Sequence, residues 1–265
     1  MNGTPSVRGP LRYSVGQRIA GLVCEADIAF DRLRREVARL GHASLWGWFG
    51  ERCRTLEAKL IELGGFDERL AEQIETCGFF GRSEDFDRFD ETETLMFELE
   101  SLCAAFFVAM QPRLNAIRVA VKAVYHAAAN EDHLPIAVPA SLQVSESFEA
   151  AWEVANFVKH HDEWGEKLQP RQRRAFVVLC RLDVAREENG ERQLDRFPLV
   201  LGTCALAGER SLDPAINAIV TRCQEGGTEL MAAVQTHFAP IAAELERVRK
   251  ANAPRLRIRS SQADD

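Results

Sequence analysis

The sequence predicts an all-α protein, a multi-helix bundle that includes a long N-terminal antiparallel helical hairpin. Apolar residues recur at steps of three and four through most of the 265 residues, which is the period of an amphipathic helix. No segment shows the convincing alternation of apolar and polar residues that marks a half-buried strand. Glycine and proline stand mainly between the periodic segments, where they end one helix or begin the next.

The composition is that of a folded protein in water. Hydrophobic residues make up 46% and charged residues 28% of the chain, which is far from the composition of a disordered protein. The net charge of −7 argues against a broadly basic surface for nucleic acid, although a local basic patch stays open. No apolar run reaches the length of a membrane span, and the first residues lack an apolar signal segment. We therefore expect a cytoplasmic protein without a membrane partner.

Seven cysteines lie within apolar helical patterns, and no two of them have C-x-x-C spacing. Their number is odd, which does not fit a complete set of disulfides. Both features favour reduced thiols in the core of a protein from a reducing compartment. From the sequence we expect neither a metal ion nor another cofactor.

Residues 14–80 predict the helical hairpin and a short helix, after an N-terminal segment, 1–13, that we expect to be disordered. The first helix ends at Gly41 and the second at the glycine pair 64–65, since glycine often follows the last turn of a helix. Two long helices joined by a short link indicate an antiparallel pair.

The apolar stripe of this hairpin includes Leu33 and Val37. Such a stripe can pack against other helices of the same chain or against a second copy in a homodimer. Packing within the chain is the favoured interpretation, and a dimer or a partner protein is the alternative.

Residues 91–252 predict a helical bundle that carries the candidate site. A loop and a domain boundary are expected at residues 81–90, which are acidic and aperiodic. Separate helices are expected before and after Pro112, because proline opens helices more readily than it continues them. The last helix is expected to be interrupted at the glycine pair 226–227, and residues 253–265 are expected to be disordered.

The most informative segment is a helix expected to begin at Ser145 or Ser147, because it carries two Trp, two His, a Lys and an Asn. Trp152, Asn156 and His160 follow one another at steps of four, so they lie on one stripe of the helix. A histidine in apolar surroundings is held neutral, which suits acid–base work. An adjacent Asn amide can fix its tautomer or hold a phosphate. These two are the candidate catalytic residues.

Four other residues are candidates for binding. Lys159 and His161 flank the stripe on the same helix. Arg171 and Arg174 share one face of the next helix at i, i+3, close enough in sequence to meet a phosphate backbone at the same site. That next helix is expected to begin at Pro170 and to end at the Asn-Gly pair 189–190.

A structural interpretation of the same stripe is also open. Asn156 and His160 can satisfy buried backbone groups while the two tryptophans belong to the core. The run from His160 to Glu163 does not predict a metal site, because consecutive residues of a helix point about 100° apart and rarely bind one ion together.

The segment Asn156-Phe-Val-Lys-His160 resembles the site motif of HEPN domains. These domains are small helical bundles, many of them metal-independent endoribonucleases of bacterial defence and toxin–antitoxin systems. Their motif is an Arg, a polar residue that is often Asn, three further residues and a His. The resemblance implies that His160 helps to activate a ribose 2′-hydroxyl, with Asn156 beside it. Ala155 stands where the family has the phosphate-binding Arg, so Lys159 or an arginine of the following helix would have to replace it.

A rival placement of the motif uses Arg118 and His126, whose spacing is one residue longer than the family's looser Arg-to-His spacing. A snorkelling arginine and a histidine at a helix end are the favoured explanation of that pair.

Two functions remain open from the sequence. One is an HEPN-like protein that binds RNA or cleaves it as a metal-independent endoribonuclease. The other is a non-catalytic scaffold or protein-interaction module in which Asn156 and His160 are structural.

Overall fold

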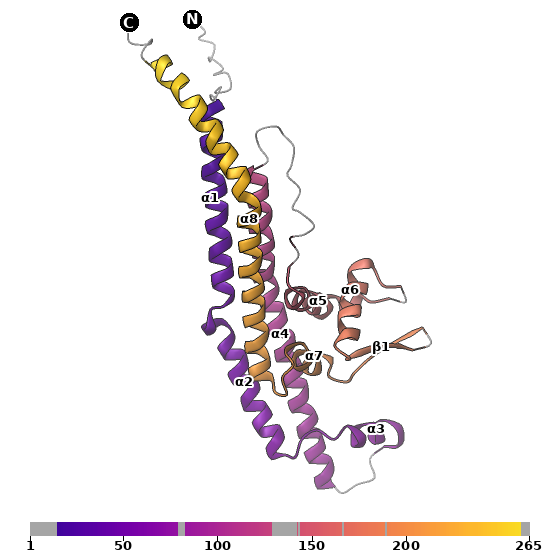
Figure 1. Ribbon diagram of the computed structural model, residues 1–265. Coiled ribbons are helices and arrows are strands. Elements are labelled where there is room, and N and C mark those ends of the chain that lie inside the picture. The colour runs from indigo at the N-terminus through magenta and orange to yellow at the C-terminus, as the bar shows by residue number, and fades with distance from the viewer. Residues whose placement is uncertain are drawn as a thin grey trace, which may run out of the picture. The chain divides into compact units, whose positions relative to one another are not determined.

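Figure 1 shows a computed structural model of the chain. The structure describes residues 15–78, 83–128, 142, 144–165, 167–188 and 190–260. In these ranges the chain forms eight α-helices, one 3-10 turn and a two-stranded sheet, so the predicted all-α class is confirmed. The segments 1–13 and 261–265, which were expected to be disordered, lie outside the described residues.

The chain divides into two compact units, and the helices α1, α4 and α8 contribute to both. The first unit comprises Met1–Arg35, Ile117–Gln143 and Glu229–Asp265, and the second comprises Glu36–Ala116 and Val144–Thr228.

The first unit consists of parts of three long helices: α1 (Val15–Leu40), α4 (Ser83–Ala128) and α8 (Leu212–Ser260). Phe30 of α1 packs edge-on against Phe238 of α8, with ring centroids 5.3 Å apart. The hydroxyl of the buried Tyr125 in α4 lies 3.3 Å from Nδ1 of His237 in α8. Aromatic contacts therefore hold the three segments together.

The helix α4 is continuous from Ser83 to Ala128 and carries Pro112 in its interior. The expected loop at residues 81–90 is thus wrong from Ser83 onward, and so are the separate helices around the proline. A proline inside a helix costs about 3 kcal/mol. Met110 and Leu114 on either side of it are completely buried, and each contributes about 1.5–3 kcal/mol, which offsets that cost.

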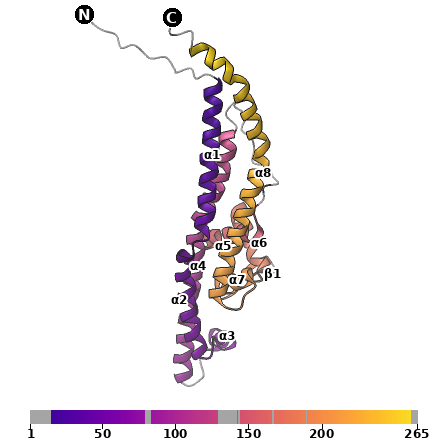
Figure 2. The same ribbon diagram turned by 60° about the vertical axis from the view of Figure 1, so that its left-hand side comes forward.

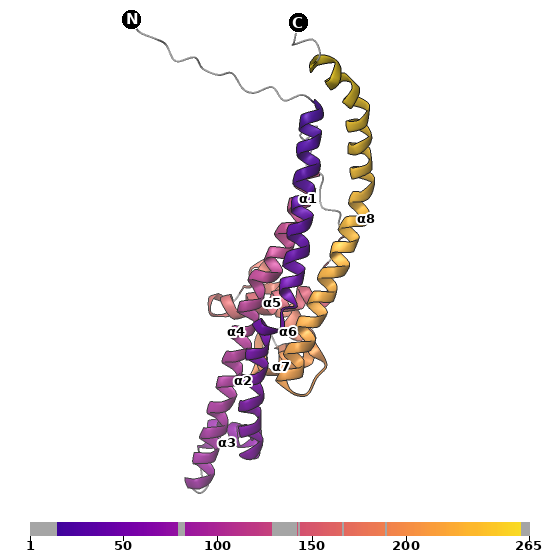
Figure 3. The ribbon, with the colours of Figure 1, turned by 90° about the vertical axis from the view of Figure 1, so that its left-hand side faces the viewer.

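The helix α8 runs without interruption from Leu212 to Ser260, as Figures 2 and 3 also show. The expected break at the glycine pair 226–227 is therefore wrong, and residues 253–260 are helical rather than disordered. A Cβ atom on Gly226 would lie 2.1 Å from Oγ of Ser145. This glycine thus permits a close approach between two segments and does not end the helix.

The second unit holds the remaining elements, and Figure 1 shows α5, α6, α7 and the sheet close together. Their bounds are α2 (Ala43–Glu62), α3 (Glu68–Cys77), α5 (Glu146–His160), the 3-10 turn η1 (His161–Glu163), α6 (Pro170–Arg181), β1 (Ala185–Glu188), β2 (Glu191–Leu194) and α7 (Pro198–Ala207).

The antiparallel pairing of the first two helices is not confirmed: Nε1 of Trp46 in α2 donates to the carbonyl of Leu40 at the end of α1 at 2.6 Å, next to the link between the two helices. Trp46 of α2 packs edge-on against Phe106 of α4, with centroids 5.6 Å apart. Leu33 and Val37 of α1 are 0% and 4% exposed, so the favoured packing of this stripe within the chain is confirmed.

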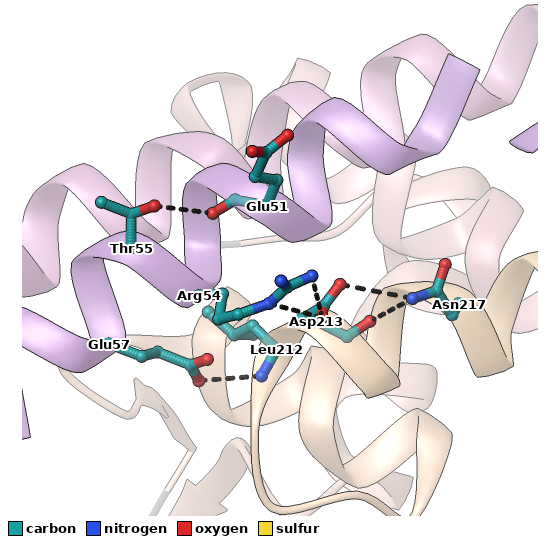
Figure 4. A network of polar contacts seen from close by, with 7 residues as sticks. All are labelled: Glu51, Arg54, Thr55, Glu57, Leu212, Asp213 and Asn217. Atoms are coloured by element: carbon teal, nitrogen blue, oxygen red, sulfur yellow. Dashed lines mark hydrogen bonds and ion pairs between the residues drawn. The ribbon is translucent and has the colours of Figure 1, made fainter. Parts of the chain in front are cut away.

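A polar cluster, the α2–α8 cluster, joins α2 to the start of α8 (Figure 4). The guanidinium of Arg54 holds the carboxylate of Asp213 at 2.7 Å, and Asn217 donates to the other carboxylate oxygen at 3.3 Å. The backbone N–H of Leu212 donates to Glu57 at 2.8 Å, which satisfies a helix N-terminus that would otherwise lack a partner. Burial raises the pKa of Glu57, although this hydrogen bond acts against the rise.

The sheet was not predicted. The helix α6 ends at Arg181, not at the Asn-Gly pair 189–190, and an antiparallel hairpin follows with Ala185 opposite Leu194 and Glu188 opposite Glu191. A two-residue Asn-Gly link between strands is a strong hairpin signal, and Gly190 has the positive φ of 82° that such a turn requires.

Candidate functional site

The site is built on α5 and α6, whose starting points agree with the sequence. Oγ of Ser145 accepts a hydrogen bond from the backbone N–H of Phe148 at 3.3 Å, which makes it the N-cap of α5. Pro170 occupies the first position of α6, where the absent N–H of proline costs nothing. The two predicted starts are confirmed.

Three aromatic rings fix the link between the two helices. Trp164 lies 5.2 Å from the ring of Phe157 in α5 and 6.1 Å from the ring of Phe176 in α6. Edge-to-face ring contacts of this kind stabilise a packed arrangement beyond their buried area. They therefore hold the end of α5 in a defined position against the beginning of α6.

An open cavity of about 470 Å³, the α5–α6 cavity, lies between α5, η1 and α6. The residues that line it are Asn156, His160, Glu163, Gln169, Pro170, Arg171, Gln172, Arg174 and Ala175. The structure thus brings together Asn156, His160, Arg171 and Arg174, which the sequence had proposed from two separate helices.

A buried carboxylate that is not itself among the lining residues holds two of them. Glu153 is 7% exposed, and it accepts hydrogen bonds from Nδ2 of Asn156 at 3.0 Å and from Nε of Arg174 at 3.3 Å. The other end of the Asn156 amide accepts from Nε2 of Gln111 in α4 at 2.7 Å. Both ends of the amide are therefore occupied, and Asn156 orients its neighbours.

The environment of His160 differs from the apolar one expected. Its side chain is 41% exposed, and Nδ1 lies 3.3 Å from a carboxylate oxygen of Glu163. A carboxylate at this distance favours a proton on Nδ1 by electrostatics and leaves the Nε2 lone pair available as a base. His160 thus lines the cavity with a carboxylate beside its Nδ1.

Lys159 and His161, two predicted binding residues, do not line the cavity. Nζ of Lys159 donates to Oε1 of Gln111. The ring of His161 packs on Phe157, and its Nε2 lies 2.7 Å from Asp162. Their role in binding stays a prediction, and neither side chain belongs to this cavity.

The cationic side chains of the cavity come from α6. Ala155 is completely buried, so the helix position that carries Arg in HEPN motifs faces the core. Arg174 is tied to Glu153 through Nε. Arg171 forms no ion pair or hydrogen bond with any residue that the structure describes, and it is therefore the charge most available to an anion.

The rival placement of the motif is not decided by the structure. Arg118 lies in α4 and takes part in an interaction, whereas the side chain of His126 lies outside the described residues.

Glu153 and Gln111 were missed by sequence reasoning. An acidic residue within the apolar stripe, between Trp152 and Val154, was the available signal for the first. The second contacts the site only because α4 packs against α5, which no local pattern reveals.

Within the described ranges, no group of three or more His, Cys, Asp or Glu side chains is arranged to hold a metal ion. Nor does that part of the chain contain a helix with the length and apolar character needed to cross a membrane. Comparison of the chain with family models, with curated proteins and with solved structures found no match.

Proposed function

We propose that the α5–α6 cavity binds the phosphodiester backbone of RNA and that His160 acts there as the general base of a metal-independent endoribonuclease of the HEPN type. One observation carries the proposal: a guanidinium without a partner among the described residues, on Arg171, shares a cavity with a carboxylate-oriented histidine. Arginine is the side chain best suited to a phosphate, because its planar fork can donate two parallel hydrogen bonds.

The chemistry needs only these groups. Nε2 of His160 takes the proton of a ribose 2′-hydroxyl, and the 2′-oxygen attacks the adjacent phosphorus. The bond to the 5′-oxygen of the next nucleotide breaks, and that oxygen takes a proton from water. The products are a 2′,3′-cyclic phosphate and a free 5′-hydroxyl. Arg171 stabilises the negative charge that builds up on the phosphoryl oxygens.

Arg174 supports the same phosphate from a fixed position. Its Nε is held by Glu153, which leaves the two terminal nitrogens for an anion and limits the entropy lost on binding. The neighbouring carboxylate also weakens the net positive charge, so Arg171 carries the larger share of phosphate affinity.

The test is cleavage and binding of single-stranded RNA by the purified protein in EDTA at low salt. Wild type is expected to cleave, and His160→Ala to lose roughly 10²-fold or more in rate while its melting temperature stays unchanged. Arg34→Gln is the control, since Arg34 is an exposed arginine of α1 whose partner among the described residues is Asp31.

If wild type binds RNA without cleaving it, the protein is an RNA-binding relative of that family and not a ribonuclease. If wild type neither binds nor cleaves RNA, the proposal is wrong. The same conclusion follows if His160→Ala only lowers the melting temperature.

A second candidate, a protein-interaction module, is favoured by exposed apolar side chains on α2. Leu45 is 40% exposed and Trp48 is 60% exposed. They share one face of α2 at i, i+3, and large apolar groups that cluster on a surface often mark interfaces. Light scattering of wild type against Trp48→Ser tests it, with a loss of oligomers expected. A charged substitution at Leu33 cannot test this interface, because that side chain is buried and its replacement would unfold the protein.

A further inference from the structure

A second and larger cavity, about 710 Å³, follows the same crevice between α5 and α6. It shares Pro170 and Arg174 with the α5–α6 cavity, so a ligand chain that occupies one can continue into the other. We call it the distal cavity.

The walls of the distal cavity carry opposite charges. Glu146 and Glu149 lie on the α5 side, and Arg173 and Arg181 lie on the α6 side. None of these four side chains forms an ion pair or a hydrogen bond with another residue in the described part of the chain. Charges of both signs that share a cavity without pairing leave room for a ligand between them.

The other two arginines of this cavity already have partners: Arg174 is paired with Glu153. Arg222 of α8 donates through both terminal nitrogens to the backbone carbonyls of Leu206 and Ala207, at 2.9 and 2.8 Å. It thus caps the end of α7, and it is not counted among the binding groups.

Apolar side chains lie between the charged walls. Ala150 of α5, Val177 and Val178 of α6 and Leu206 of α7 all line the cavity. Val177 is exposed, which offers an apolar surface to a flat ring. The distal cavity therefore combines an apolar contact surface, hydrogen-bond acceptors and guanidinium donors, which are the three kinds of group that a nucleotide uses in binding.

We propose that the distal cavity binds the base of the nucleotide next to the scissile phosphate and selects guanine. This inference rests on the proposed function of the α5–α6 cavity. The carboxylates of Glu146 and Glu149 can only accept hydrogen bonds when ionised. Guanine presents two adjacent donors, N1–H and N2–H, to one carboxylate, whereas uracil presents a single N–H. The arginines of α6 hold the flanking phosphate.

The experiment measures the affinity of the full-length protein for fluorescent single-stranded 2′-O-methyl oligonucleotides, which lack the reactive hydroxyl and stay intact. One oligonucleotide contains only uridine, and the other carries a single guanosine. Wild type is expected to bind the second at least about fivefold more tightly, as a two-hydrogen-bond base contact implies.

The variant with both Glu146→Gln and Glu149→Gln is expected to lose this preference and to keep or improve its affinity for the uridine oligonucleotide. Glu51→Gln is the matched control, because Glu51 is an exposed helical glutamate of α2 outside both cavities, and it should retain the preference. A melting temperature for each variant verifies that the fold is intact.

Equal affinities for the two oligonucleotides in wild type would overturn the guanine subsite and leave RNA binding in place. A preference that survives in the double variant would overturn it as well. If wild type binds neither oligonucleotide, the guanine subsite and the proposed function both fail.

Discussion

The α2–α8 cluster and the α5–α6 cavity use the same kinds of side chain for different ends. In the first, Arg54 and Asp213 satisfy each other, and Glu57 satisfies a backbone N–H at the start of α8 (Figure 4). In the second, Arg171 has no partner in the described residues, and His160 has the carboxylate of Glu163 beside Nδ1. We call the α2–α8 cluster the closed network, because its charged groups satisfy one another and so stabilise the fold. We call the α5–α6 cavity the open network, because some of its polar groups are left to bind a ligand.

The largest expected effect is a loss of stability when a side chain is added at Gly50, next to Asp213 of the closed network. A Cβ atom on Gly50 would lie 2.2 Å from Oδ1 of Asp213. Gly50→Ala is therefore expected to push the carboxylate away from Arg54 and to lower the free energy of unfolding by about 1–3 kcal/mol. Urea denaturation measures the change. Gly47→Ala, on the same helix with open space around it, is the control and should not destabilise the protein.

A smaller effect, this time a gain in RNA affinity, is expected at Glu153, which binds Asn156 and Arg174. Glu153→Gln removes the charge that partly neutralises Arg174, so the affinity for RNA should rise about threefold. The substitution also exchanges a hydrogen bond between two ions for one between an ion and a neutral amide, which should cost about 1 kcal/mol of stability. Fluorescence titration and urea denaturation measure the two quantities. Weaker RNA binding in this variant would show that Arg174 does not contact the phosphate.

Glu163→Gln should have a milder effect, since the side chain is largely exposed. The proposed function assigns this carboxylate to the orientation of His160, so kcat for RNA cleavage is expected to fall a few-fold. Initial rates of RNA cleavage by wild type and variant measure the change. An unchanged kcat would mean that Glu163 does not orient the base.

The smallest expected effect concerns pH. Burial raises the pKa of Glu57 above its usual value, so the folded state holds this proton more tightly than the unfolded state does. The stabilisation from this proton is full below the unfolded pKa and is lost as the pH rises through the folded pKa. Glu57→Gln should flatten the pH dependence of stability in this acidic window. A variant with the same pH dependence as wild type would contradict the assignment.

Local signals predicted the elements that position the site. Ser145 caps α5 and Pro170 opens α6 as expected, because a cap and a first-turn proline act through their own backbone neighbours. Steps of three and four placed Asn156 with His160, and Arg171 with Arg174. Packing of α5 on α6 then brought the two pairs to one cavity, which the sequence proposed but could not establish.

The missed hairpin had a local signal in its Asn-Gly link, whereas the other failures come from long-range packing. Pro112 and Gly226 predicted breaks that the structure lacks, because buried neighbours at the first and a close contact with Ser145 at the second outweigh the local preference. Glu153 and Gln111 escaped notice for the same reason, since their partners come from other helices or later turns. Local propensity cannot report a contact that forms only when helices meet.

The most direct test compares one arginine from each network. RNA affinity and the free energy of unfolding are measured for Arg171→Gln and for Arg54→Gln. Arg171→Gln should weaken RNA binding roughly tenfold without loss of stability, and Arg54→Gln should destabilise the protein without changing RNA affinity. If Arg171→Gln lowers stability and leaves RNA binding unchanged, the α5–α6 cavity is a structural cluster and the account is wrong.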